Sequence, residues 1–249
     1  MTEVLAIIPA RGGSKGLPRK NILDFAGHPL LAYSIAAGLK AKSINRVIVS
    51  TDDKKIAEIS LHCGAEVPFL RPAKFARDDT PDLPVFVHAL QWLIRHEGYC
   101  PDVIVHLRPT SPLRRVKQID AAVQLLLDHP EADSVRTVIA PCQNPFKMWT
   151  IQTGGFMKPL IKTKHKEAYN LPRQTLPKVF WQTGYVDTIR TATILEKHSM
   201  TGNRILPLVL NPDDWIDIDT PDDWQKAEDL LLSGKITFKK LGFKLGKEK

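Results

Sequence analysis

The chain has 249 residues, 43% hydrophobic and 25% charged, which is typical of a globular protein large enough to bury a core. Its formal net charge is +8, but the last fifteen residues carry six lysines and one glutamate, so the rest is mildly basic. No apolar run approaches the roughly 18 residues that span a bilayer, and the N-terminus lacks the basic start of a signal peptide. Because the body of the chain is only mildly basic, its positive charge indicates a binding site only where several cations cluster.

Short apolar runs and helical patterns alternate through the first 140 residues. Strands are predicted at 4–9, 46–50, 66–70, 102–107 and 134–139, and helices at 29–40, 53–63, 83–97 and 117–127. This alternation implies crossover connections and a mainly parallel sheet with helices on both faces. The predicted fold class is α/β, with three layers of the Rossmann-like type.

The pattern changes after Pro141. Residues 142–180 contain scattered prolines and glycines with weak periodicity, and we interpret them as an excursion from the sheet that acts as a dimer arm or lid. The α/β pattern returns in a final set of elements, with strands at 178–187, 204–210 and 215–218 and a closing helix at 221–232. We predict one domain over 1–236 and a basic tail over 237–249.

The stretch IPARGGSKGLPRKN, residues 8–21, follows the first predicted strand. Parallel sheets bind ligands at the carboxyl ends of their strands. The glycines allow backbone N–H groups to approach an anion closely, and four cations add charge; these are Arg11, Lys15, Arg19 and Lys20. The loop therefore predicts a polyphosphate site. Neither the Walker pattern nor the dinucleotide-binding fingerprint is present, which disfavours kinases and dehydrogenases.

Several motifs resemble, in the right order, the cytidylyltransferases that activate sialic acids and related nonulosonic or Kdo-type sugars as CMP derivatives. Besides the loop, these are VIVSTDD (47–53), GAEVPFLRP (64–72), RPTSPLR (108–114), PRQTLP (172–177) and DIDT (217–220). The resemblance covers about residues 3–232. It implies a nucleotidyltransferase fold and transfer of CMP from CTP to the anomeric hydroxyl of a 2-keto-3-deoxy sugar acid, with release of pyrophosphate.

The resemblance also implies residue roles, since such catalysis consists mostly of positioning and charge neutralisation. The expected nucleotide-binding residues are Arg11, Gly12, Gly13, Ser14, Lys15, Lys20, Asn21 and Arg71. Among these, Asn21 is expected at the ribose and Arg71 at the cytosine. The expected catalytic residues are Arg11, Lys20 and Asp219, the last as a general base.

The segment WIDIDTPDDW offers two carboxylates, Asp217 and Asp219. If it is a strand, both point to the same face, where like charges repel unless a cation joins them. The resemblance assigns this pair to metal, and Mg²⁺ is the expected cofactor because it prefers oxygen ligands. Thr220, Pro221 and Asp223 predict a helix N-terminus. Asp52 and Asp53 could either cap the next helix or assist at the site.

The expected acceptor-binding residues are Arg108, Thr110, Ser111, Arg173, Gln174 and Thr183. Two of them depart from the family pattern. Arg108 stands where sialic acid enzymes usually have glutamine, and Thr183 stands where asparagine is common. An arginine at this position would suit a more acidic acceptor, or a sugar that lacks the N-acyl and glycerol groups of sialic acid.

Two alternatives remain open. One is a nucleotidyltransferase acting on a sugar 1-phosphate or another phosphorylated acceptor, with Arg108 binding the phosphate. The other is a non-catalytic nucleotide- or RNA-binding protein, which the acidic pair at 217 and 219 disfavours. Three widely spaced cysteines suit reduced thiols in the cytoplasm. We expect a homodimer, with CTP and a sugar acid as partners and with no nucleic acid or membrane.

Overall fold

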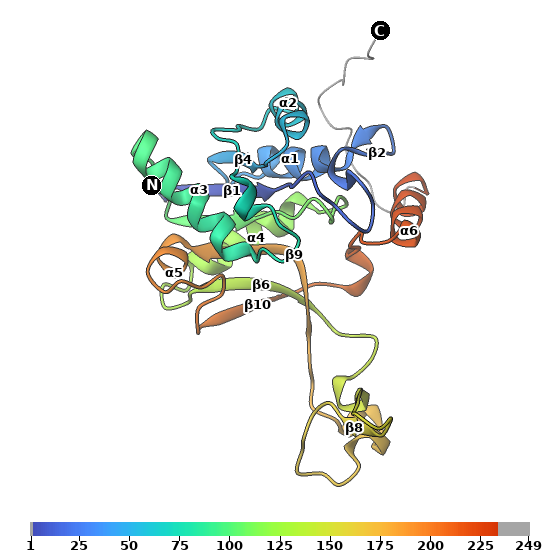
Figure 1. Cartoon of the computed structure of the whole chain (residues 1–249). Helices are drawn as coiled ribbons and strands as arrows, with labels where there is room; N and C mark the ends of the chain where they lie inside the picture. Colours follow the sequence, from blue (N-terminus) through green and yellow to red (C-terminus); the bar gives the residue numbers. More distant parts are fainter. Residues whose placement is uncertain (1, 234–249) are drawn as a thin grey trace.

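A six-stranded sheet forms the centre of the computed structural model, which describes residues 2–233; the tail predicted at 237–249 lies outside them. The strand order is β10-β6-β9-β5-β1-β4 (Figure 1). The strands are β1 (Val4–Pro9), β4 (Arg46–Ser50), β5 (Val103–His106), β6 (Ser134–Ile139), β9 (Trp181–Arg190) and β10 (Ile205–Val209). All run parallel except β9, which is antiparallel to β5 and β6. The mainly parallel sheet is confirmed.

Helices cover both faces of the sheet. They are α1 (Leu30–Lys40), α2 (Lys54–His62), α3 (Asp82–Glu97), α4 (Val116–Leu127), α5 (Thr191–Leu195) and α6 (Pro221–Leu232). Because side chains alternate along a strand, Ala6 and Ile8 of β1 pack in the core with α1 and α4, whereas Leu5 and Ile7 pack with α3 and α5. The predicted three-layer α/β class is confirmed.

Smaller elements occupy the connections. Two short hairpins pair β2 (Asp24–Phe25) with β3 (His28–Pro29), and β7 (Trp149–Ile151) with β8 (Met157–Pro159). Single 3-10 turns lie at Lys20–Ile22, Ala73–Phe75, Pro145–Lys147, Ala168–Asn170, Arg173–Thr175 and Pro212–Asp214. None of the helices among residues 2–233 is long and apolar enough to cross a membrane.

Two predicted strands are wrong. Residues 66–70 make only two isolated bridges, at Glu66 and Leu70, because Pro68 between them has no N–H to donate to a ladder. Residues 215–218 are irregular. There the Ile218 N–H donates to the Thr110 carbonyl at 2.8 Å, so this segment is tied to the loop after β5 rather than to a strand. The helix predicted at 221–232 does form, with a capping box between Thr220 and Asp223.

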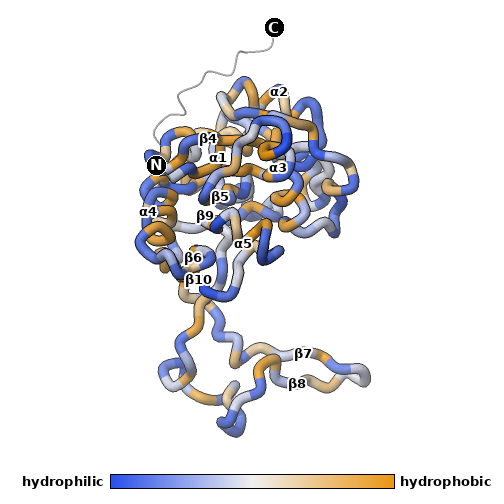
Figure 2. Tube along the Cα trace, turned by 90° about the vertical axis from the view of Figure 1, so that its left-hand side faces the viewer, coloured by the Kyte–Doolittle hydropathy of each residue, from blue (hydrophilic) through white to orange (hydrophobic). Residues whose placement is uncertain are grey.

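Residues 142–180 leave the body between β6 and β9 and project away from it as an arm (Figures 1 and 2). The only sheet within this segment is the β7–β8 hairpin. Large apolar side chains, among them Ile151 and Phe156, are exposed along it. The predicted excursion therefore exists as a structural feature, and its role as a dimer arm stays a prediction.

Candidate active site

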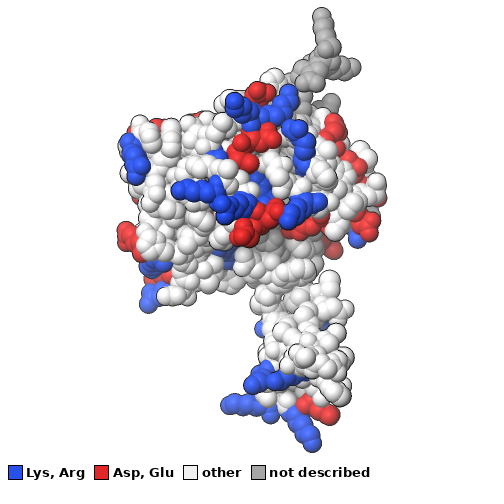
Figure 3. Space-filling view, in the orientation of Figure 1, with Lys and Arg blue, Asp and Glu red and all other residues white. Residues whose placement is uncertain are grey.

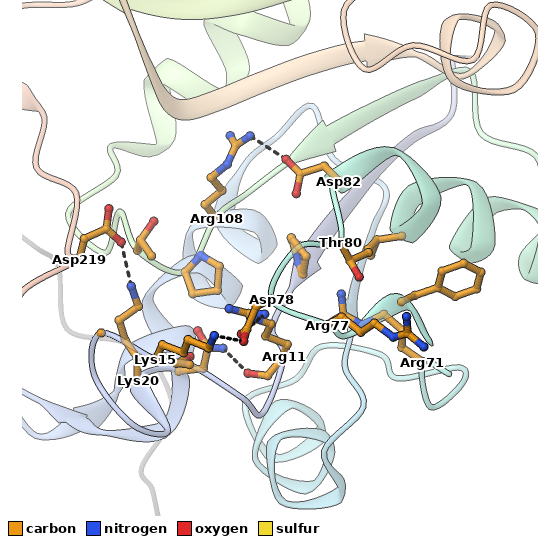
Figure 4. Close-up of a pocket in the computed structure, with 18 of the residues that line it drawn as sticks. Arg11, Lys15, Lys20, Arg71, Arg77, Asp78, Thr80, Asp82, Arg108 and Asp219 are labelled. Atoms are coloured by element: carbon orange, nitrogen blue, oxygen red, sulfur yellow. Dashed lines mark hydrogen bonds and ion pairs between the residues drawn. The ribbon is translucent and has the colours of Figure 1, made fainter. Parts of the chain in front are cut away.

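A cavity of about 510 Å³ opens where β1 and β5 end (Figure 4). It gathers nine of the residues that the sequence predicted for the site, namely Arg11, Ser14, Lys15, Lys20, Asn21, Arg71, Arg108, Thr110 and Asp219. They come from the loop after β1, the segment after α2, the loop after β5 and the segment before α6. Parallel strands thus bring distant motifs to one edge of the sheet, as expected for this topology.

Close packing fixes the path of the loop after β1. A Cβ on Gly12 would lie 2.9 Å from Asp53 Oδ2, and one on Gly16 would lie 2.8 Å from the Asp219 carbonyl oxygen. The Gly12 N–H donates to Asp52 at 3.1 Å, and the buried Asn21 amide donates to the Arg11 carbonyl at 2.9 Å. Two glycines are thus required by neighbouring chain segments. In this structure Asn21 orients the loop.

An aspartate from another segment bridges two of the loop cations. Asp78 lies between the 3-10 turn at 73–75 and α3, and its carboxylate contacts Arg11 at 2.8 Å and Lys15 at 2.5 Å (Figure 4). The hydrogen bond from Lys15 holds the pKa of Asp78 below its ordinary value. Asp78 thus pairs with two cations, Arg11 and Lys15, that a polyphosphate would need.

Lys20 connects the loop to the acidic segment before α6. Its Nζ donates to the Ile218 carbonyl at 2.7 Å and to Asp219 at 3.0 Å. The Lys20 side chain is largely buried, whereas that of Asp219 is 71% exposed. The contact places one cation and one carboxylate together at the cavity wall.

Asp217 is the second carboxylate of this segment. Its Oδ1 is buried and has no hydrogen-bond partner among the described atoms. Burial raises its pKa, and the charge of Asp219 acts in the same direction, while a hydrogen bond with Thr110 opposes both. No group of three or more potential metal-ligating side chains forms within the described part of the chain. The pair nevertheless fits a cation with oxygen ligands, because an unpartnered buried carboxylate oxygen needs a counter-charge.

Arg71 is buried at the opposite end of the cavity from Lys20 (Figure 4). Its backbone N–H donates to the Thr51 carbonyl at 2.7 Å, while Nε and Nη2 have no hydrogen-bond partner. Asp52 lies 3.8 Å from Nη2, and burial lowers the Arg71 pKa. A buried guanidinium with unused donors suits recognition of carbonyl and ring nitrogen acceptors. Of the two neighbouring aspartates, Asp53 caps α2 and Asp52 contacts the site.

Arg108 follows β5, and its side chain contacts both the neighbouring strand β9 and helix α3. It donates to Asp187 of β9 at 2.6 Å, to the Gly184 carbonyl at 3.1 Å and to Asp82 of α3 at 3.1 Å. The buried Arg114 donates in turn to the Arg108 carbonyl at 2.8 Å. Arg108 is therefore paired with two carboxylates.

The remaining predicted residues do not line this cavity. Gly12 and Gly13 of the loop, the buried Ser111 and Asp217 are not among the lining residues. Thr183 is buried and donates to Thr137 at 3.0 Å. Arg173 and Gln174 lie on the arm beside a separate cavity of about 440 Å³, where Arg173 donates to the Pro141 carbonyl.

Most residues of one wall of this cavity were not predicted from the sequence. The segment from the 3-10 turn to α3 contributes Phe75, Arg77, Asp78, Thr80, Asp82 and Val85, and β5 contributes His106. The charged run RDDTPD at 77–82 was the available signal. Its position after a strand-like segment placed it at the same sheet edge as the loop.

An α/β fold with a cationic loop after its first strand and carboxylates opposite defines a nucleotidyltransferase-type site. Comparison with known proteins identifies the family within this class of nucleotidyltransferases. Residues 5–205 match the family model described as cytidylyltransferase, and the chain therefore belongs to this family.

Individual relatives agree with this assignment. The chain is 34% identical over 230 residues to CMP-N,N'-diacetyllegionaminic acid synthase of Legionella pneumophila, covering 92% of this chain and 96% of the relative. It is 30% identical to post-translational flagellin modification protein B of Campylobacter coli, covering 96% and 99%. The structure of a CMP:2-keto-3-deoxy-manno-octonic acid synthetase complexed with CTP shares the fold, with a TM-score of 0.70 at 16% identity and coverage of 93% and 99%.

The Asp78 bridge leads to a testable prediction. Because its carboxylate competes for Arg11 and Lys15, we expect Asp78→Asn to bind CTP about 2- to 5-fold more tightly than wild type in calorimetry. Asp79→Asn is the matched control, since it removes the same charge from the adjacent, exposed position, which does not line the cavity. Weaker binding by Asp78→Asn would show instead that Asp78 preorganises the loop.

Proposed function

We propose that the chain transfers CMP from CTP to the anomeric hydroxyl of a 2-keto-3-deoxy sugar acid of the nonulosonic type, releasing pyrophosphate. The observation that carries this proposal is the meeting of Arg11, Lys15 and Lys20 with an acidic segment in one cavity. The name of the Legionella relative supports a nonulosonic acceptor. We also propose a cytoplasmic location, because the free thiols of Cys63, Cys100 and Cys142 suit a reducing compartment.

The charges indicate how the site acts. Arg11, Lys15 and Lys20 bind the triphosphate and stabilise the charge that develops on the departing pyrophosphate. Arg71 directs its unused donors to the cytosine. The acceptor hydroxyl oxygen bonds to the α-phosphorus as the bond to the β-phosphate oxygen breaks. The hydroxyl proton passes to the Asp219 carboxylate, which is exposed at the cavity wall.

Asp217 and Asp219 would hold Mg²⁺, the expected cofactor. The unpartnered Oδ1 of Asp217 is the observation that supports this assignment. When bound, the ion adds positive charge beside the phosphates. Lys20 of the loop already donates to Asp219, so its charge and that of the ion would both offset negative charge on the phosphates.

The arm supports a homodimer. Seven large apolar side chains on the arm or at its base are exposed: Met148, Ile151, Phe156, Met157, Leu160, Phe180 and Trp181. A two-stranded hairpin cannot bury such a surface by itself. An apolar cavity of about 420 Å³ lies beside it, between Pro141 and Trp181. Arg173 and Gln174 lie on this arm, so their predicted acceptor role would be exercised at the site of a second copy.

The alternatives receive less support. Membership in an enzyme family argues against a non-catalytic RNA-binding protein. The sugar 1-phosphate alternative depended on Arg108 as the phosphate-binding group, and Arg108 is already paired with Asp82 and Asp187.

Substrate identity is tested by pyrophosphate release with Mg²⁺, each of the four common nucleoside triphosphates, and a panel of 2-keto-3-deoxy sugar acids and sugar 1-phosphates. We expect release with CTP and a nonulosonic acid, because Arg71, with its unused donors, and the loop cations line the same cavity. Turnover only with a sugar 1-phosphate or with another triphosphate would refute the proposal.

The metal assignment predicts that Asp219→Asn lowers kcat at saturating Mg²⁺ by about 10²- to 10³-fold. CTP binding without metal should not weaken, because Arg11 and Lys15 are untouched and Lys20 loses only a competing carboxylate. Asp222→Asn is the matched control, since this exposed aspartate lies in the first turn of α6, three residues on. Near-normal turnover by Asp219→Asn would contradict both its metal and its base role.

The dimer prediction is tested by light scattering at micromolar concentration, where we expect twice the 28.0 kDa chain mass. The pair Ile151→Glu and Phe156→Glu should give monomers, because charge on an apolar interface is costly to bury. Leu61→Glu on α2 is the control, since Leu61 is also exposed but lies on the body. A monomeric wild-type protein would refute the homodimer.

A further inference from the structure

Arg108 cannot serve as a free anion receptor at its end of the cavity. Its Nη2 donates to Asp82 at 3.1 Å (Figure 4). Its Nη1 donates to Asp187 at 2.6 Å, so the guanidinium is paired with two carboxylates. Burial alone would lower its pKa, but the charges and hydrogen bonds of Asp187 and Asp82 raise it. The guanidinium thus stays charged and stays paired.

The buried carboxylate beside Arg108 is shared with a second arginine. Asp187 is fully buried and also forms an ion pair with the buried Arg136. The buried Arg114 donates to the Arg108 carbonyl rather than to either carboxylate. His106 lies 3.9 Å from Asp82, and complete burial lowers its pKa well below its ordinary value, so it is neutral and adds no charge.

Backbone packing keeps Arg108 in place. Gly184 has a φ of +66°, and a Cβ there would come within 2.9 Å of Arg108 Nη1. The Gly184 carbonyl accepts a hydrogen bond from the same nitrogen at 3.1 Å. If Arg108 swung toward a substrate anion, its own contacts to Asp187 and Gly184 would be lost in a largely dry environment.

Asp82 is the more accessible member of the pair. It is the first residue of α3, it lines the cavity, and its side chain is 44% exposed against 26% for Arg108. A single oxygen, Oδ2, makes the contacts to Arg108 and His106. Its other oxygen takes part in neither contact, and an ionised carboxylate accepts but does not donate hydrogen bonds.

We propose that Asp82, held by Arg108, determines acceptor specificity by accepting a hydrogen bond from an uncharged substituent, an acylamino N–H or a hydroxyl, of the sugar acid. A second anionic group on the acceptor would meet the exposed Asp82 carboxylate beside an arginine that is already paired, and is selected against. This inference rests on the proposed function and narrows its substrate class. It also replaces the expectation that Arg108 favours a more acidic acceptor.

The experiment measures kcat/KM for sugar acids that are matched except for one substituent remote from the carboxylate: acylamino, hydroxyl or phosphate. We expect wild type to disfavour the phosphorylated acceptor by about 10-fold or more. Asp82→Asn should raise the KM for the best uncharged acceptor about 10-fold. It should also shift relative kcat/KM toward the phosphorylated acceptor, since the negative charge that faces the acceptor beside Arg108 is then removed. The KM for CTP should stay unchanged.

Asp79→Asn is the control, because it removes the same charge three residues away without facing the cavity. Asp82→Ser serves as a second variant, and matching melting temperatures establish that each is folded. Wild-type preference for the phosphorylated acceptor overturns the inference, as does an unchanged acceptor profile in Asp82→Asn, or a parallel rise in the KM for CTP. Wild type that is inactive with every sugar acid refutes the proposed function itself.

Discussion

The positive charge that follows β1 can be concentrated in one cavity only because carboxylates from distant segments counter it. Lys20 and Asp219 are 199 positions apart in the chain, yet they lie 3.0 Å apart. Asp78 bridges Arg11 and Lys15 from the segment before α3. Like charges held this close would repel without such partners. Each ion pair also links a connecting segment to the sheet edge, and acidic and basic side chains lie next to one another on the face of the body drawn in Figure 3.

Backbone contacts stabilise the same arrangement. The Ile218 N–H donates to Thr110, the Lys20 ammonium donates to the Ile218 carbonyl, and Gly16 packs against the Asp219 carbonyl. The loop after β1, the loop after β5 and the segment before α6 thus form one connected rim. A strand at 215–218 would have taken these backbone groups into a ladder and left the rim open. The irregular conformation of this segment is what lets it close the site.

The sequence predicted those features that depend on local patterns. Apolar runs located the strands of the sheet, and the cationic glycine loop located the cavity, because both signals are carried by neighbouring residues. Pro68 was visible in the sequence but was outweighed by its apolar neighbours, so a strand was predicted where only bridges form. Asp78, Asp82 and Asp187 could not be assigned, since their partners lie in other segments and only tertiary packing reveals them. Packing adds a contact at Thr183 that its motif did not suggest, because its buried hydroxyl donates to Thr137; its acceptor role stays a prediction.

The cations of the cavity fall into two groups, which differ in the burial of their aspartate partners. Asp78 and Asp219 are exposed, so their ion pairs with the loop are weak and can be exchanged for phosphate oxygens at little cost. Asp187 is fully buried, so giving up its ion pair with Arg108 is costly in the low-dielectric interior. The loop cations are therefore available to a charged substrate, whereas Arg108 is committed to the protein. One cavity can thus bind a polyphosphate through its loop cations and present the Asp82 carboxylate to an acceptor, because Arg108 is paired inside the protein.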